Sequence, residues 1–223
     1  MNQINQEFAD VALFPIPGCV CFPSSTMPLH IFEPRYRAMI KDCARLGRRI
    51  GVSHTVKEIS SARKNQTKAE ILNSNQTTYE AQKIFSAGFV EIEDVTADGR
   101  MAVKIMMDTR YESVEEIQTL PYRIDRCRIY QDQKSPDNEQ ANLKSKVLQL
   151  LRAKFDTGSA ELRAIFDPAN WAAYTTEEFS FRIFSVVRLE TELSQAILEM
   201  RTASTRLNSL ICILDRNDIA PGV

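Results

Sequence analysis

The chain has 223 residues, of which 43% are apolar and 26% are charged, so it is long enough to bury one large or two small hydrophobic cores. Its formal net charge is −1, and neither half carries the strong basic excess that is typical of nucleic-acid-binding proteins. No apolar run approaches the roughly 20 residues that span a bilayer, and no secretory signal is visible, so we predict a cytoplasmic protein with no membrane association.

The first 50 residues alternate short apolar runs with prolines. Strands are predicted at Val11–Phe14, Cys19–Phe22 and Met27–Phe32, and prolines end the first two. A helix is predicted from Pro34 to Leu46, because proline is favoured in the first turn of a helix. Gly47 is expected to end this helix. Its buried face is expected to consist of five residues at helical spacing: Tyr36, Met39, Ile40, Cys43 and Leu46.

The next segment mixes polar sequence with further strands. A strand is predicted at Ile50–Ser53, and the polar residues 57–78 are predicted to form a long loop, with room for one helical turn at residues 69–72. An Asp98-Gly99 pair marks a tight hairpin. The strands around it are predicted at Gly88–Val95, Arg100–Met107, Arg110–Glu116 and Tyr122–Tyr130. Many short strands and one good helix indicate a small mixed or antiparallel β-barrel.

The pattern becomes helical after Gln131, beyond a polar linker. Helices are predicted from Ser135-Pro136 to about Phe155, at residues 160–166, from a Thr175/Glu178 capping box through Val187, and around residues 193–200 and 207–214. We therefore predict an α+β protein with two domains. A β-barrel domain with one long helix is expected at residues 1–133, and an α-helical bundle at residues 134–223.

Sequence motifs for common catalytic sites are absent. No glycine precedes a lysine, so no phosphate-binding G-x-x-x-x-G-K-[ST] loop occurs, and neither G-x-G-x-x-G nor G-x-S-x-G is present. We interpret His30 as a structural histidine rather than a general base or pH sensor, since no partner motif accompanies it. Glu33 and Arg35, on either side of Pro34, are expected to stabilise the strand–helix junction. We predict no enzyme activity, no catalytic residue, no metal and no cofactor.

The five cysteines fit a reducing compartment, because their number is odd and no Cys-x-x-Cys pair occurs. Cys19 and Cys21 would share one face of a strand. We interpret them as small buried apolar residues rather than as a metal-binding or redox pair.

A basic stripe and one methionine are the candidate partner-binding residues. The stripe lies on one face of the predicted helix and just beyond it, at spacings of three and four residues: Arg37, Lys41, Arg45 and Arg48. This pattern would suit an acidic partner or RNA. The alternative, a solvated face opposite the buried one, is favoured because no exposed aromatic residues are interleaved. Met106 alternates away from its apolar neighbours and is a candidate contact for varied peptides.

Residues 13–37, LFPIPGCVCFPSSTMPLHIFEPRYR, resemble the start of the amino-terminal substrate-recognition domain of Lon-type ATP-dependent proteases. The pattern there is roughly L-F-P-L-P-x-x-V-x-F-P-x-x-x-x-P-L-H-I-F-E-P-R-Y-R. Further similarity occurs at Gly88–Val95, Asp98–Arg100, Leu120–Arg123 and Arg206-Leu207. One departure is that the family often has G-L-x-R-(F/Y), of which residues 107–111 keep only the arginine–aromatic end.

The resemblance implies a pseudo-barrel related to the PUA fold, followed by a helical bundle. It also implies a stand-alone, bacterial-type Lon substrate-binding-domain protein without ATPase or protease modules. Unfolded or client polypeptides are then the expected partners, and the function is expected to be non-catalytic binding. RNA binding, known among PUA relatives, is the alternative, although the balanced charge argues against nucleic acid. A small-molecule enzyme with a barrel pocket is a third hypothesis, with little support in the sequence.

Overall fold

The chain divides into two units. The first unit comprises residues 1–130, and the second comprises residues 131–223. The computed structural model describes residues 8–61, 67, 74–134, 142–155, 164–216 and 220–221. The described elements of the first unit are, in chain order, β1 (Phe8–Pro15), β2 (Thr26–Ile31), α1 (Pro34–Leu46), β3 (Ile50–Ser53), β4 (Thr55–Ser60), β5 (Thr78–Ala81), β6 (Ile84–Val95), β7 (Met101–Gln118) and β8 (Ile124–Ile129).

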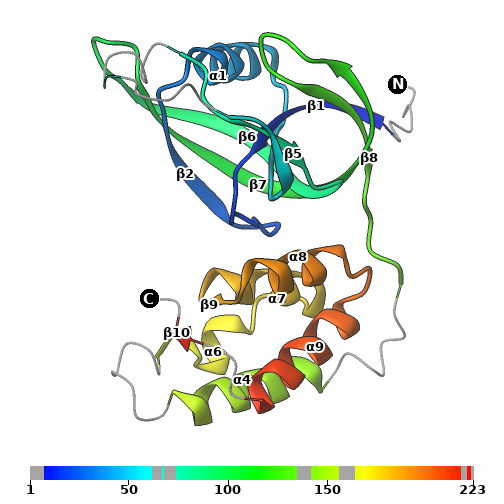
Figure 1. Ribbon diagram of the computed structural model, residues 1–223. Helices are drawn as coiled ribbons and strands as arrows, with labels where there is room; N and C mark the ends of the chain where they lie inside the picture. The colour runs from blue at the N-terminus through cyan, green and yellow to red at the C-terminus, as the bar shows by residue number, and fades with distance from the viewer. Residues whose placement is uncertain are drawn as a thin grey trace, which may run out of the picture. The chain divides into compact units, whose positions relative to one another are not determined.

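Five strands close into a ring in the order β1, β3, β6, β7 and β8, because β8 pairs with both β7 and β1. The β1–β3 pair is parallel, and β2 and α1 intervene between these strands in sequence. One edge of β7 pairs with β6, as Figure 1 shows for these two long strands. The other edge pairs first with β2, at residues 101–106, and then with β8, at residues 111–118. The predicted α+β barrel class is therefore confirmed.

Helix α1 forms where local signals predict it. Pro34 occupies its first turn, and Gly47 ends it in the left-handed conformation (φ 62°), with its N–H bonded to the carbonyl of Cys43. Four of the five predicted inward residues are buried in the barrel core, but Leu46 is 53% exposed. The buried stripe thus ends at Cys43, one turn before the cap, and including Leu46 in it was wrong.

Two apolar clusters lie on opposite faces of β1, as strand alternation requires. Ala12 and Phe14 belong to the larger cluster, which contains the buried face of α1 and the inward side chains of β7. Val11 and Leu13 belong to the smaller cluster, with the buried Phe85 of β6. Because this part of β1 is covered on both faces, residues 11–15 form a continuous apolar run rather than an alternating one.

Several predicted boundaries differ from the structure. Cys19–Phe22 is not a strand: positive φ angles at Gly18 (70°) and Ser24 (67°) turn the chain on either side of it. The predicted loop at residues 57–78 contains most of β4 and the first residue of β5, which pair with each other. The strands predicted at residues 100–107 and 110–116 are one continuous strand, β7. The predicted helical turn at residues 69–72 lies outside the described residues.

The second unit is built from short helices around a separate apolar core. Its described elements are α4 (Leu143–Lys154), α6 (Pro168–Trp171), α7 (Thr176–Arg182), the 3-10 helix η1 (Ile183–Ser185), β9 (Val187–Arg188), α8 (Thr191–Glu199), α9 (Ala203–Asp215) and β10 (Ala220–Pro221). The predicted capping box is present: the Thr175 hydroxyl accepts from the Glu178 N–H, and the Glu178 carboxylate accepts from the Thr175 N–H.

Helix α7 ends sooner than predicted, because η1 tightens the chain and Val187 pairs with β10. The proposed cap at residues 135–136 and the first part of the helix predicted at residues 160–166 lie outside the described residues. Among the described helices, none is both long and apolar enough to cross a membrane.

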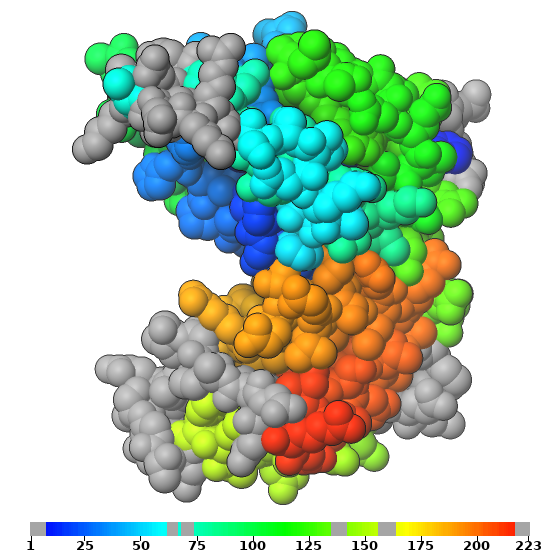
Figure 2. All heavy atoms as spheres, in the orientation of Figure 1, coloured from blue at the N-terminus to red at the C-terminus, as the bar shows by residue number. Residues whose placement is uncertain are grey.

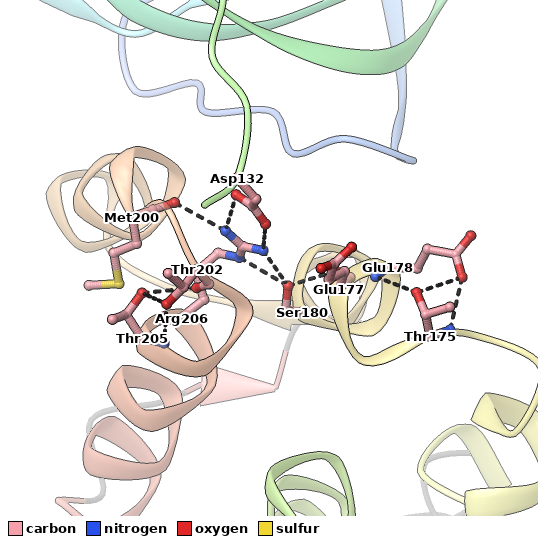
Figure 3. A network of polar contacts seen from close by, with 9 residues as sticks. All are labelled: Asp132, Thr175, Glu177, Glu178, Ser180, Met200, Thr202, Thr205 and Arg206. Atoms are coloured by element: carbon pink, nitrogen blue, oxygen red, sulfur yellow. Dashed lines mark hydrogen bonds and ion pairs between the residues drawn. The ribbon is translucent and has the colours of Figure 1, made fainter. Parts of the chain in front are cut away.

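A buried arginine organises the second unit. Arg206 of α9 is fully buried, and its guanidinium donates to both carboxylate oxygens of Asp132, to the Ser180 hydroxyl and to the Met200 carbonyl (Figure 3). It also lies over the ring of Phe181, 3.8 Å from the ring centroid. One side chain therefore joins the segment after β8 to α7 and to the end of α8.

Candidate functional site

A pocket of about 510 Å³ opens on the first unit, where the ends of several elements meet. It lies between the end of β1, the start of α1, the β4–β5 hairpin and residues 119–123. We call it the cis-proline pocket, because the Leu120–Pro121 peptide bond in its wall is cis. Its volume is within the range of about 300–1,000 Å³ that is typical of ligand sites. Its apolar and aromatic lining residues are Leu13, Pro15, Tyr36, Ile59, Tyr79, Leu120, Pro121 and Tyr122.

Two lining side chains expose a large apolar area to solvent. Leu120 is 76% exposed, and Ile59 of β4 is 60% exposed. The β4 side chains lie at the surface of the first unit, where Figure 2 draws this part of the chain in cyan. Leucine and isoleucine are usually buried, so these two residues mark the pocket as a surface that a partner could cover.

One side of the pocket is held by the junction at Pro34. The Arg35 guanidinium donates to the Glu33 carboxylate (2.9 Å), the Thr78 hydroxyl (3.0 Å) and the Thr77 carbonyl (2.9 Å). The same Glu33 carboxylate accepts from the backbone N–H of Gln76 at 2.9 Å. Glu33 and Arg35 therefore fix the start of β5 against the start of α1, which agrees with their predicted structural role.

Two of the lining tyrosines, Tyr36 and Tyr122, are held in place by contacts. Tyr36 stacks on Phe14 with ring centroids 4.0 Å apart, and burial raises the pKa of Tyr36 to about 12. The Tyr122 hydroxyl donates to Asp42 at 3.0 Å. Burial and this hydrogen bond raise the pKa of Tyr122 to about 12 as well.

These two tyrosines predict an alkaline transition. An ordinary tyrosine has a pKa of about 10. Because the folded-state pKa is higher, the neutral phenols stabilise the fold below pH 10, and this stabilisation is lost as the pH rises from 10 to about 12. In a pH titration followed by absorbance at 295 nm, some tyrosines should ionise only above pH 10. The Y36F and Y122F variants should each have one fewer of these late-ionising tyrosines. Ionisation of all tyrosines near pH 10, with the circular dichroism spectrum unchanged, would contradict this.

The pocket is also lined by charges that are already paired. Arg123 forms a bidentate bond to the fully buried Asp125, at 2.7 Å to each oxygen, and also lies 3.4 Å from Glu116. The hydrogen bonds to Asp125 raise the pKa of Arg123. The Thr119 hydroxyl donates to Glu116 at 2.6 Å. A charged ligand would have to compete with these contacts, so the pocket is better suited to an apolar side chain.

None of the five predicted partner-binding residues lines the cis-proline pocket. Within the basic stripe, Arg37 donates to the carbonyl of Asp98 at 3.1 Å, and Arg45 lies 3.5 Å from Asp42. Lys41 is exposed. Arg48 lines a separate depression of about 440 Å³ at the end of α1, together with Phe8, Leu46, Arg49 and Arg126.

Met106 lies on the outer face of β7 and is 50% exposed. It is opposite Phe89 of β6, and the guanidinium of Arg49 lies over the Phe89 ring at 4.3 Å. Arg49 also forms a bidentate pair with Asp108, at 3.1 Å to each oxygen. The predicted outward direction of Met106 agrees with the structure, and an aromatic neighbour lies beside it.

The pocket residues were not recognised as a site from sequence. The sequence indicates Leu120–Arg123 only as a family element and Tyr36 only as a core residue. The available signal was Leu120 itself, a large apolar residue between Thr119 and Pro121 in a turn.

Comparison with known proteins places the chain in a family. Residues 10–216 match the family described as the ATP-dependent protease La (LON) substrate-binding domain. The fold is similar to a Lon N-terminal domain protein from Xanthomonas campestris (TM-score 0.60, 17% identity, covering 92% of this chain and 98% of that one). It is also similar to the N-terminal domain of Mycobacterium avium complex Lon protease (TM-score 0.65, 14% identity, with the same coverage). A search of curated proteins gives no significant match. The predicted resemblance is confirmed, and the chain belongs to the Lon substrate-binding domain family.

Proposed function

We propose that this chain binds segments of other polypeptides and that an apolar side chain of the client occupies the cis-proline pocket. The proposal rests on the exposed apolar wall formed by Leu120 and Ile59 in a concave site. Membership of a substrate-binding family supports it. The role is non-catalytic: the chain holds a client and carries out no chemistry on it.

The expected selectivity follows from the rim. Because Arg35, Arg123 and Glu116 are each paired within the first unit, they offer few unpaired charges to a client. Affinity then comes mainly from apolar burial, which contributes about 1.5–3 kcal/mol for a leucine-sized side chain. In binding of this kind each contact contributes little free energy, and many client sequences can be accommodated. Both properties suit a protein that binds varied unfolded clients.

Leu120→Asp tests this directly. The substitution removes apolar area and places a carboxylate where the client side chain would lie, so affinity should fall about ten-fold or more, corresponding to 1.4 kcal/mol or more. Fluorescence anisotropy with a labelled, permanently unfolded polypeptide measures the change. Val95→Asp is the matched control, since Val95 is also an exposed apolar residue of the first unit but does not line the pocket.

Equal affinity of L120D and the unmodified chain, or an equal loss in V95D, would contradict the assignment. Circular dichroism and thermal unfolding must show both variants folded, and exposed positions are expected to tolerate the change. Absence of any binding by the unmodified chain would instead contradict the function as a whole.

We further propose that the basic stripe attracts acidic segments of clients. Lys41 and Arg45 are its exposed members, and the exposed Arg45–Asp42 pair is a weak competitor. Long-range attraction of this kind increases the association rate and is screened by salt. A K41E/R45E variant should bind an acidic unfolded polypeptide more slowly at low salt, with little change at high salt. A salt-independent association rate for the unmodified chain would contradict this role.

A further inference from the structure

Cys19 and Cys21 bring their sulfur atoms to within 3.9 Å of each other. Both lie in the irregular connection between β1 and β2, with Val20 between them. On an extended strand the side chains of residues i and i+2 are parallel and well separated. The turns that replace the predicted strand therefore place the two thiols in contact.

The connection is anchored on both sides of the pair but not at its centre. The Gly18 N–H donates to Nδ1 of His54 at 3.1 Å, and the Cys21 carbonyl accepts from the Ser86 hydroxyl at 2.7 Å. Among the described backbone hydrogen bonds, none involves the N–H of Val20 or of Cys21. The sulfur atoms need to approach by about 2 Å to bond, and none of the described backbone hydrogen bonds holds Val20 against that movement.

The two thiols are unequal, as a reactive pair requires. Cys19 is half-buried, whereas Cys21 is only 6% exposed. The hydrogen bond between the two thiols lowers the pKa of Cys19. The same bond, together with burial, raises the pKa of Cys21. Cys19 is thus the accessible nucleophile, and Cys21 lies close enough to attack a mixed disulfide that forms on Cys19.

We propose that Cys19 and Cys21 form a thiol–disulfide exchange site whose co-substrate is a small organic disulfide such as glutathione disulfide. The Cys19 thiolate attacks one sulfur of the small disulfide, forming a mixed disulfide and releasing one thiolate. Cys21 then transfers its proton to solvent, and its thiolate attacks the Cys19 sulfur. This step forms the Cys19–Cys21 bond and releases the second small thiolate. The protein pair is oxidised by two electrons, and the small disulfide is reduced to two thiols.

The test uses the full chain and glutathione disulfide. In C212S, which lacks the one exposed competing cysteine, four thiols remain, and two should disappear on oxidation and return with excess dithiothreitol. No lysine or arginine precedes Arg35, so trypsin releases Cys19 and Cys21 in one peptide with no other cysteine. That peptide should lose two hydrogen atoms and carry no glutathione.

Two further variants in the C212S background identify the roles. C21S should accumulate a stable glutathione adduct on Cys19, because the resolving thiol is gone. C19S should react about ten-fold or more slowly, because Cys21 is buried and retains its proton. Retention of all four thiols in C212S, or a lasting glutathione adduct on Cys19 when Cys21 is present, would overturn the proposal. Near-native circular dichroism spectra show that the variants are folded.

Discussion

Arg206→Met is expected to lower the free energy of unfolding of the second unit by about 3–5 kcal/mol, the usual result of removing one partner from a buried ion pair. Arg206 is fully buried, and the Asp132 side chain is only 19% exposed. Methionine keeps much of the length and apolar volume of the side chain. The expected loss of unfolding free energy therefore comes mainly from the hydrogen bonds and the ion pair that the guanidinium makes.

Those groups come from three separate parts of the second unit. Without the guanidinium, the carboxylate of Asp132 loses a bidentate partner and the buried hydroxyl of Ser180 loses two donors (Figure 3). The carbonyl of Met200 loses a hydrogen bond of 3.0 Å. Removing a hydrogen-bond partner from a buried polar group costs about 1–3 kcal/mol for each group, and more for a charged one.

The single tryptophan makes this measurement specific. Trp171 is buried in the second unit, packed edge-to-face against Phe179 with ring centroids 5.2 Å apart. Its fluorescence during urea unfolding therefore follows this unit. Arg216→Ala is the matched control, since Arg216 is an exposed arginine at the end of α9, the helix that carries Arg206. This substitution should change the free energy of unfolding by no more than about 0.5 kcal/mol. A change below about 1 kcal/mol for R206M would show that the network contributes little.

Gly88→Ala is expected to destabilise the barrel by about 3 kcal/mol or more. A Cβ atom at Gly88 would lie 1.8 Å from the backbone oxygen of Met106 and 2.9 Å from Cα of Met107. These are backbone atoms of the paired strand and cannot rotate away. The β6–β7 register also shifts between Ala87 and Gly88. Alanine would therefore force the two strands apart at this position.

Hydrogen exchange followed by mass spectrometry locates this effect. Peptides covering β6 and β7 should lose protection in G88A, while those covering α9 should not change if the units unfold separately. Glu91→Ala is the control, because Glu91 is an exposed residue of the same strand and its loss should have little effect. Unchanged protection of β6 and β7 in G88A would show that this strand pair can absorb an added methyl group.

Local signals explain which parts of the fold were predictable. Pro34 and Gly47 mark the ends of α1, and the Thr175/Glu178 pair marks the start of α7, because each acts on its own turn of backbone. Strand β4 was missed because its side chains are exposed or half-exposed and polar residues predominate, so no apolar alternation reveals it. Strand β7 was divided because the polar residues near Asp108 interrupt an otherwise alternating pattern.

The candidate site could not be predicted from local signals, because it exists only after closure of the fold. Pro15, Tyr36, Tyr79 and Leu120 are far apart in sequence and become neighbours only in the pocket. Arg206 and Asp132 are 74 residues apart in sequence and likewise become neighbours only in the folded chain. Sequence similarity drew attention to Arg206, but not to its partner.

Closure of the ring affects how the protein can recognise a client polypeptide. The strands β1, β3, β6, β7 and β8 each pair with a neighbour on both sides along part of their length, so an added strand is excluded from those paired stretches. The outer edge of β2 carries Pro28, which cannot donate an amide hydrogen. Recognition at these paired stretches would therefore depend on side chains rather than on peptide groups, and a client bound there would not need to be extended.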